Sequence, residues 1–174
     1  ALSSEIADSL YVAIMTDTGS FRFPKTDSEL HRIIAHLIDS GADPVSLYQK
    51  VYEQGPPNRL RLFGKTLANL KVTGDGTVAL LTVTQQMFRE TGTDESDTET
   101  FVTSTLAIKG VQIGLMFTEL RDGVKISFRS RGEIRINELA KEFGGNGHKN
   151  AAGARVSGMP LGFVIKQVLE QSKK

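Results

Sequence analysis

The sequence predicts an α/β protein in which a helical N-terminal part precedes a domain with a small mixed sheet. Two observations carry this prediction. Up to about residue 70, apolar residues recur only at the spacing that is typical of helices. After the turn signal Gly74-Asp75-Gly76, segments rich in β-branched residues alternate with helical segments. Interleaved strands and helices are typical of a sheet that packs against helices, so residues 73–174 are expected to form one α/β domain.

Helices are expected throughout residues 1–55, and each has a capping residue in front of an apolar stripe. The first begins at Ser3 or Ser4, the second at Thr26 or Asp27, and the third at Asp43-Pro44. The side chains expected to pack inward are Ile6, Leu10 and Ile14 with Ala7 and Tyr11 beside them, then Leu30, Ile33, Ile34, Leu37 and Ile38, then Val45, Leu47, Tyr48 and Val51.

A double proline, Pro56-Pro57, marks the expected boundary between the two parts. A helix follows it to about residue 70, so residues 56–72 are predicted to form a linker helix. Beyond it, strands are expected at 77–84, 111–120, 124–131 and 154–157, and helices at 94–106, 136–143 and 160–171. The strand at 124–131 alternates, with Val124, Ile126 and Phe128 on one side and Lys125, Ser127 and Arg129 on the other.

The charges are distributed unevenly along the chain. Residues 125–174 carry ten basic and four acidic residues, whereas residues 75–124 carry three basic and eight acidic ones. A basic segment favours a polyanionic ligand, and the alternative is that it pairs with the acidic segment. The sequence has no cysteine, which excludes disulfide frameworks and thiolate metal sites and favours a cytoplasmic protein. No apolar run is long enough to cross a bilayer, so no membrane partner is expected.

The most informative segment is residues 144–153, Gly-Gly-Asn-Gly-His-Lys-Asn-Ala-Ala-Gly. It has almost no side chain to bury, so it is expected to lie outside the core with its backbone free to approach a ligand. Successive amides in a glycine-rich turn form a nest for anions, and His148 and Lys149 add cationic or hydrogen-bonding groups. The segment therefore favours phosphate binding. The alternative is a helix C-cap at Gly144 followed by a surface loop.

Three segments together carry a resemblance to a known family. They are Tyr-Val-Ala-Ile-Met-Thr-Asp-Thr-Gly-Ser-Phe-Arg-Phe at 11–23, Ser-Phe-Arg-Ser-Arg-Gly at 127–132, and the glycine-rich segment at 144–153. In order and spacing they resemble the DHH phosphoesterases. Among these, they are most similar to the bacterial oligoribonucleases (nano-RNases) that also remove the 3′-phosphate of phosphoadenosine phosphate. The family form usually has glycine where this chain has Asn146, and asparagine tolerates a positive φ, so a similar loop geometry is expected.

The resemblance implies a domain organisation. Residues 1–55 are similar to the end of a DHH catalytic domain, 56–72 to the linker helix, and 73–174 to the complete DHH-associated substrate-binding domain. The family's binuclear manganese or magnesium centre takes most of its ligands from N-terminal motifs, including an Asp-His-His triplet that this sequence lacks. The chain is therefore expected to be a C-terminal fragment whose partner is the missing N-terminal catalytic segment, and to be inactive alone.

The resemblance also implies roles for individual residues. Asp17 resembles the last aspartate ligand of the metal centre. Its carboxylate suits this role, because hard divalent ions prefer carboxylate oxygens. From the local sequence, the alternative is an aspartate that hydrogen-bonds its own backbone in a turn. His148 resembles the catalytic group that holds the substrate phosphate near the metals. Arg129 and Arg131, on one side of a strand, would grip phosphate, and a solvated strand face is the alternative. The remaining substrate-binding candidates are Gly145, Asn146, Gly147, Lys149 and Asn150.

For the intact enzyme, the resemblance implies metal-dependent hydrolysis of short single-stranded RNA and of nucleotide phosphates such as 3′-phosphoadenosine 5′-phosphate. Exopolyphosphatase, single-strand exonuclease and cyclic-dinucleotide phosphodiesterase are alternatives within the same family. For this chain by itself, a non-catalytic nucleotide-binding module is an alternative, as is an interaction domain whose glycine-rich segment is only a turn. The resemblance is also compatible with a homodimer assembled through the catalytic domain.

Overall fold

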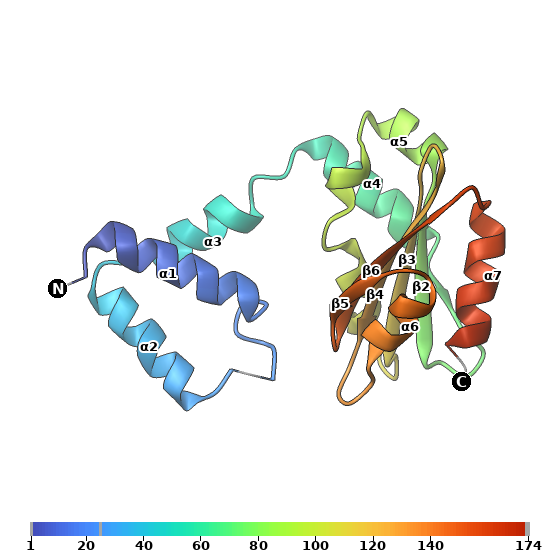
Figure 1. The fold of residues 1–174 in the computed structure, drawn as a ribbon. Helices are drawn as coiled ribbons and strands as arrows, with labels where there is room; N and C mark the ends of the chain where they lie inside the picture. Colours follow the sequence, from blue (N-terminus) through green and yellow to red (C-terminus); the bar gives the residue numbers. More distant parts are fainter. Residues whose placement is uncertain (1, 25, 173–174) are drawn as a thin grey trace. The chain divides into compact units, whose positions relative to one another are not determined.

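The computed structural model describes residues 2–24 and 26–172. The chain divides into two compact units, Ala1–Gly55 and Pro56–Lys174. The first unit consists of helices, and the second contains a mixed sheet that packs against helices on both faces (Figure 1). This confirms the α/β fold class expected from the sequence. None of the helices in the described ranges is long and apolar enough to span a membrane.

Helices α1 (Ser4–Asp17), α2 (Ser28–Asp39) and α3 (Pro44–Tyr52) make up the first unit. Each begins at an expected capping residue, because the side chains of Ser3, Asp27 and Asp43 accept hydrogen bonds from amides of the first turn. The helices pack around a small cluster of buried residues: Ala7, Tyr11, Met15, Ile34, Leu37, Ala42 and Leu47.

The buried face of α1 agrees only in part with the expected one. Ala7 and Tyr11 are buried as expected, together with Met15, whereas Ile6 and Leu10 are 52% and 44% exposed. Residues 6, 10 and 14 recur at helical spacing, and so do residues 7, 11 and 15. The sequence of α1 therefore contains two adjacent apolar stripes. The stripe that becomes buried depends on the direction from which α2 and α3 approach, and local spacing carries no information about that direction.

Helices α2 and α3 bury only part of their expected apolar faces. Ile34 and Leu37 on α2 and Leu47 on α3 are buried. The large apolar side chains that stay exposed on these helices are Ile33, Ile38, Val45, Tyr48 and Val51. A unit of short helices encloses a small interior, so it covers wide apolar stripes incompletely.

In the second unit, the described residues form a six-stranded sheet with the order β1-β2-β3-β4-β6-β5. The strands are β1 (Lys71–Val72), β2 (Val78–Val83), β3 (Ile113–Glu119), β4 (Gly123–Ser130), β5 (Asn146–His148) and β6 (Ala151–Ser157). β2 and β3 are parallel and the other neighbouring pairs are antiparallel, so the sheet is mixed, as predicted. The β3–β4 hairpin turns at residues 120–122, between Glu119 and Gly123.

Helices cover the two faces of the sheet in separate layers (Figure 1). On one face, α6 (Ile136–Glu142) and α7 (Leu161–Gln171) pack over a core that includes Phe117, Ile126 and Phe128. On the other, α4 (Pro57–Ala68), α5 (Gln85–Thr91) and the 3-10 helix η2 (Phe101–Ala107) pack over Leu81, Val83 and Met116. Strand β2 contributes to both layers, which explains its continuous apolar run.

Residues 94–106 do not form the single helix that the sequence predicts. They form two short 3-10 helices, η1 (Glu95–Thr98) and η2, with Thr100 at a φ of 72° between them. Threonines are frequent here and disfavour a regular helix, because their hydroxyls compete for backbone carbonyls. Thr98 Oγ1 donates to Glu95 O at 2.7 Å, and Thr105 Oγ1 donates to Val102 O at 2.6 Å.

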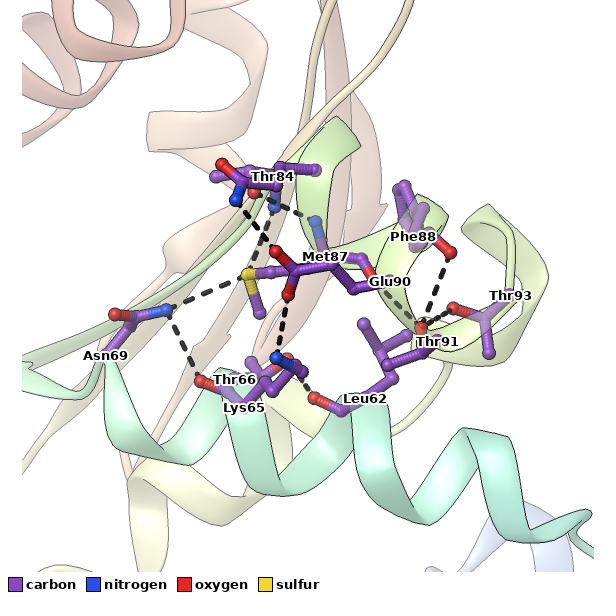
Figure 2. Close-up of polar contacts among 11 residues, drawn as sticks. Leu62, Lys65, Thr66, Asn69, Thr84, Met87, Phe88, Glu90, Thr91 and Thr93 are labelled. Atoms are coloured by element: carbon purple, nitrogen blue, oxygen red, sulfur yellow. Dashed lines mark hydrogen bonds and ion pairs between the residues drawn. The ribbon is translucent and has the colours of Figure 1, made fainter.

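Helix α4, which the sequence predicts as a linker, is also a layer of the second unit. Leu62 is completely buried in the cluster over β2. Figure 2 shows the polar contacts that join α4 to α5: the Lys65 ammonium lies 2.7 Å from the Glu90 carboxylate, and the Asn69 amide donates to the Met87 sulfur at 3.7 Å. Helix α5 was not among the predicted elements, because its seven residues are too few for a clear apolar periodicity.

Candidate functional site

Side chains on the β4–β6–β5 half of the sheet form an exposed polar surface. β4 buries Val124, Ile126 and Phe128, as its alternation predicts, so Lys125, Ser127 and Arg129 face the other side. The antiparallel register continues this surface onto β6 and β5, because residues directly opposite each other point to the same side. The rows are Arg129–Ala151–His148, Ser127–Gly153–Asn146 and Lys125–Arg155. We call these eight residues the open face; all of them are exposed or partly exposed.

Arg129 is a desolvated cation on the open face. Burial of its side chain lowers the pKa of the guanidinium below its ordinary value. Its Nη1 donates to the carbonyl oxygen of Phe128 at 2.8 Å. In the described part of the chain, no carboxylate forms an ion pair with it. A partly buried guanidinium without a carboxylate partner retains donors for an oxyanion ligand.

His148 lies in the same row of the open face as Arg129. Ala151 separates the two residues in the register, and Gly153 lies in the adjacent row. The residue between the imidazole and the guanidinium in this row therefore contributes only a methyl group. His148 is exposed, so its ring is accessible to a ligand. A guanidinium and an imidazole on one flat surface can donate hydrogen bonds to different oxygens of the same phosphate.

Lys149 and Asn150 form the turn between β5 and β6, and both side chains bind elsewhere in the chain. The Lys149 ammonium lies 2.6 Å from the Glu133 carboxylate in an exposed ion pair, which adds little stability. The Asn150 amide donates to Ser130 Oγ at 2.9 Å and to the carbonyl oxygens of Gly132 and Ile134 at 3.1 and 3.2 Å. Asn150 therefore fastens the hairpin to the turn after β4.

The glycine-rich segment is mostly a β-hairpin and not a free loop. Contrary to expectation, Ala152 is only 7% exposed and belongs to the core. Gly145 and Gly147 permit this close packing. A Cβ on Gly145 would lie 2.3 Å from the Gly153 carbonyl oxygen, and one on Gly147 would lie 2.4 Å from the Ala151 carbonyl oxygen. Both glycines are therefore required by the backbone packing of the second unit.

Several amides of this segment are used inside the protein. The amides of Gly144 and Gly145 donate to the carbonyls of Lys141 and Ala140 at 3.0 and 2.9 Å and so end α6. The Gly147 amide donates to the Asn146 side chain at 2.7 Å. Gly144 has a φ of 70°, as the alternative interpretation of a helix C-cap requires. The predicted nest of free glycine amides is thus wrong for these three residues, and side chains remain for anion recognition.

Arg131 does not lie beside Arg129 on one strand, as the sequence predicts. β4 ends at Ser130, whose hydroxyl donates to the carbonyl of Ile134 at 2.7 Å and closes a turn. Within this turn, the Arg131 guanidinium donates to the carbonyl oxygen of Leu106 in η2. The Arg131 amide still donates to the carbonyl oxygen of Gln112 at 3.0 Å, so Arg131 lies directly after the last residue of β4 and only the end of the predicted strand differs.

Asp17 ends α1 and precedes a tight turn in the first unit. Gly19 adopts a φ of 57°, and the non-glycine residues Ser20 and Phe21 have φ values of 57° and 63°; such strained backbone in non-glycine residues is concentrated at functional sites. The Asp17 side chain is exposed. Within the residues that the structure describes, no group of three or more His, Cys, Asp or Glu side chains could hold a metal ion. These residues by themselves therefore do not fit a binuclear centre, because Asp17 is a single exposed carboxylate.

The third row of the open face contains an ion-pair cluster that the sequence did not predict. Glu95 Oε1 lies 2.9 Å from the Lys125 ammonium and also accepts a hydrogen bond from the Arg155 guanidinium. Burial alone would raise the pKa of Glu95, but these hydrogen bonds lower it overall. The alternation of β4 already put Lys125 on the exposed side. Its partners depend on the β4–β6 register and on η1, which local patterns do not define.

Known proteins are similar to this chain in sequence and fold. The profile of the DHHA1 domain matches residues 75–172, which include the whole open face. The chain is 33% identical over 168 residues to the bifunctional oligoribonuclease and PAP phosphatase NrnA of Thermus thermophilus, covering 97% of this chain and 50% of that protein. It is 28% identical over 155 residues to the protein of the same name from Bacillus subtilis, covering 89% and 49%.

A solved structure agrees with these matches. The exopolyphosphatase-related protein of Bacteroides fragilis has a TM-score of 0.91 and 37% identity, covering 98% of this chain and 51% of that chain. The chain thus spans about half the length of the relatives it matches. The resemblance indicated by residues 127–132 and 144–153 is confirmed, and this chain belongs to the DHHA1 domain family.

Proposed function

We propose that the open face is the substrate-binding surface of a metal-dependent phosphoesterase that acts on short single-stranded oligoribonucleotides and on 3′-phosphoadenosine 5′-phosphate. The observation that carries the proposal is the row of Arg129 and His148. It combines a desolvated guanidinium, which has no carboxylate partner among the described residues, with an accessible imidazole. The names of the two NrnA relatives support nucleotides as the substrate class.

In this proposal, five of the predicted site residues have distinct parts in ligand or metal binding. Arg129 binds two phosphate oxygens, and His148 donates a hydrogen bond to the same phosphate. Asn146 lies in the next row and reaches the adjoining sugar or phosphate. Lys149 lies at the hairpin turn and approaches the ligand by exchanging its exposed Glu133 partner. Asp17 contributes one ligand to a Mn²⁺ or Mg²⁺ centre whose other ligands lie outside the described residues.

Arg129→Gln is expected to lower the affinity of the 174-residue chain for a 5′-labelled diribonucleotide. Loss of a bidentate contact between charged groups costs about 1.5–3 kcal/mol, or about tenfold or more in Kd. Fluorescence anisotropy measures the affinity. The matched control is Arg89→Gln, which removes an exposed arginine of α5 outside the open face. Equal affinities of the Arg129→Gln and Arg89→Gln variants would exclude the proposed phosphate site.

The 174-residue chain is expected to bind the diribonucleotide without hydrolysing it. The physical reason is the ligand set: the described residues present no cluster that could hold a metal ion. The measurement is electrophoretic separation of the labelled products after incubation with MnCl₂ at a chain concentration that saturates binding. Cleavage by the purified chain, lost in its Asp17→Asn variant, would mean that the metal centre is complete within these residues.

A further inference from the structure

The third row of the open face holds two cations opposite each other. Lys125 on β4 and Arg155 on β6 are direct partners in the antiparallel register. Like charges in this position destabilise a sheet unless an anion lies between them. Here that anion is Glu95 Oε1, which contacts both cations. Among the described ion pairs, Glu95 is the carboxylate that two cations share.

The contacts of Glu95 have the form of an oxyanion site that the protein fills with its own carboxylate. An ammonium and a guanidinium that converge on one oxygen are the groups that bind phosphate in proteins. All three side chains are accessible, with Lys125 28%, Glu95 29% and Arg155 58% exposed. A single carboxylate neutralises only one of the two cations, so the row keeps a net positive charge even when Glu95 is in place.

Glu95 can leave this row without unfolding its own element. It belongs to η1, whose backbone is fixed by a capping box between Asp94 and Asp97. The carboxylate reaches the open face through a flexible side chain, so rotation of its side-chain torsions is sufficient to release Lys125 and Arg155. The lowered pKa of Glu95 keeps it ionised at neutral pH, where it competes with other anions for these two cations.

We propose that Lys125 and Arg155 form a second phosphate subsite, which binds an interior phosphate of a single-stranded oligoribonucleotide longer than a dinucleotide, and that Glu95 occupies this subsite in its absence. The inference rests on the proposed function, because it requires another phosphate of the same strand at Arg129. Lys125 and Arg129 are four residues apart on β4, which corresponds to about 13 Å. This distance exceeds the spacing between two successive phosphates of a strand. When one phosphate of a diribonucleotide is bound at Arg129, no other phosphate of the same molecule therefore reaches Lys125.

The test compares a labelled diribonucleotide with a labelled tetraribonucleotide. Arg155→Gln is expected to weaken binding of the tetraribonucleotide about tenfold and to leave the diribonucleotide unchanged. The slope of log K against log salt for the tetraribonucleotide should become shallower by about 0.7, as expected for one lost phosphate contact to a single strand. Glu95→Gln should strengthen tetraribonucleotide binding about fivefold, because it removes the competing charge.

The controls separate this inference from the proposed function. Lys166→Gln removes a 77% exposed lysine of α7 and should change neither affinity. Thermal unfolding verifies that each variant is folded. If Arg129→Gln leaves diribonucleotide binding unchanged, the proposed function fails and the inference fails with it. A different result overturns the second subsite alone. In that case Arg129→Gln weakens binding of both ligands, but Arg155→Gln weakens binding of the two ligands equally or leaves both affinities unchanged. Unchanged or weaker tetraribonucleotide binding by Glu95→Gln overturns the competing role of Glu95.

Discussion

Gly145→Ala is expected to lower the free energy of unfolding of the second unit by about 3 kcal/mol. The added methyl group would lie 2.3 Å from the carbonyl oxygen of Gly153 and 2.9 Å from that of Ala140. Both are backbone atoms, one in β6 and one in α6, so the clash cannot be relieved by rotation of a side chain. Urea denaturation followed by circular dichroism measures the change.

The neighbouring Gly144 supplies a matched control. A Cβ there meets nothing within 4 Å, although φ is 70°. Gly144→Ala should therefore cost only the conformational strain of a left-handed alanine, about 1–2 kcal/mol. Because Gly145 leads directly into the strand that carries His148, Gly145→Ala should also weaken diribonucleotide binding. Equal destabilisation by the two substitutions would contradict the close packing between α6 and β6.

Leu62→Ala is expected to destabilise the second unit by about 3 kcal/mol, within the range for removing a buried leucine side chain. Leu62 is completely buried among Leu81, Phe88 and Met116, so its loss leaves a cavity between α4 and the sheet. The free energy of unfolding of the second unit, from the same urea titration, measures the effect.

Leu60 lies on the same helix and is 62% exposed. Leu60→Ala should change the free energy of unfolding by less than about 0.5 kcal/mol, as is usual for a surface substitution. The pair of variants tests whether α4 is a structural layer of the second unit. If Leu62→Ala were as mild as Leu60→Ala, α4 would act as a linker without a stabilising role, and the packing described here would be wrong.

The open face joins chemistry from strands that are separated in the sequence. Arg129 and Lys125 come from β4, whereas His148 and Arg155 come from the β5–β6 hairpin. The small residues Ala151 and Gly153 leave the surface between them flat. The two subsites proposed on this surface differ in one respect: Glu95 fills the second, and no carboxylate in the described ranges fills the first. A longer strand would have to displace Glu95, so the open face would discriminate between ligands by length.

Local sequence determined much of this protein. Ser3, Asp27 and Asp43 cap helices where predicted, because a capping hydrogen bond spans only two or three residues. The alternation of β4 placed Arg129 on an exposed side, because successive side chains of any strand point to opposite faces. The motifs at 127–132 and 144–153 identified the family for the same reason: they are contiguous and can be read without the fold.

Only the tertiary structure decided the rest. The buried stripe of α1 depends on where α2 and α3 lie, and the contact of Arg131 depends on the position of η2, whose Leu106 carbonyl it binds. The partnership of Glu95 with Arg155 joins residues 60 positions apart. These features are set by strand register and by the packing of distant elements. Helical spacing and strand alternation describe only a few neighbouring residues, so they show which side chains share a face but not what that face meets.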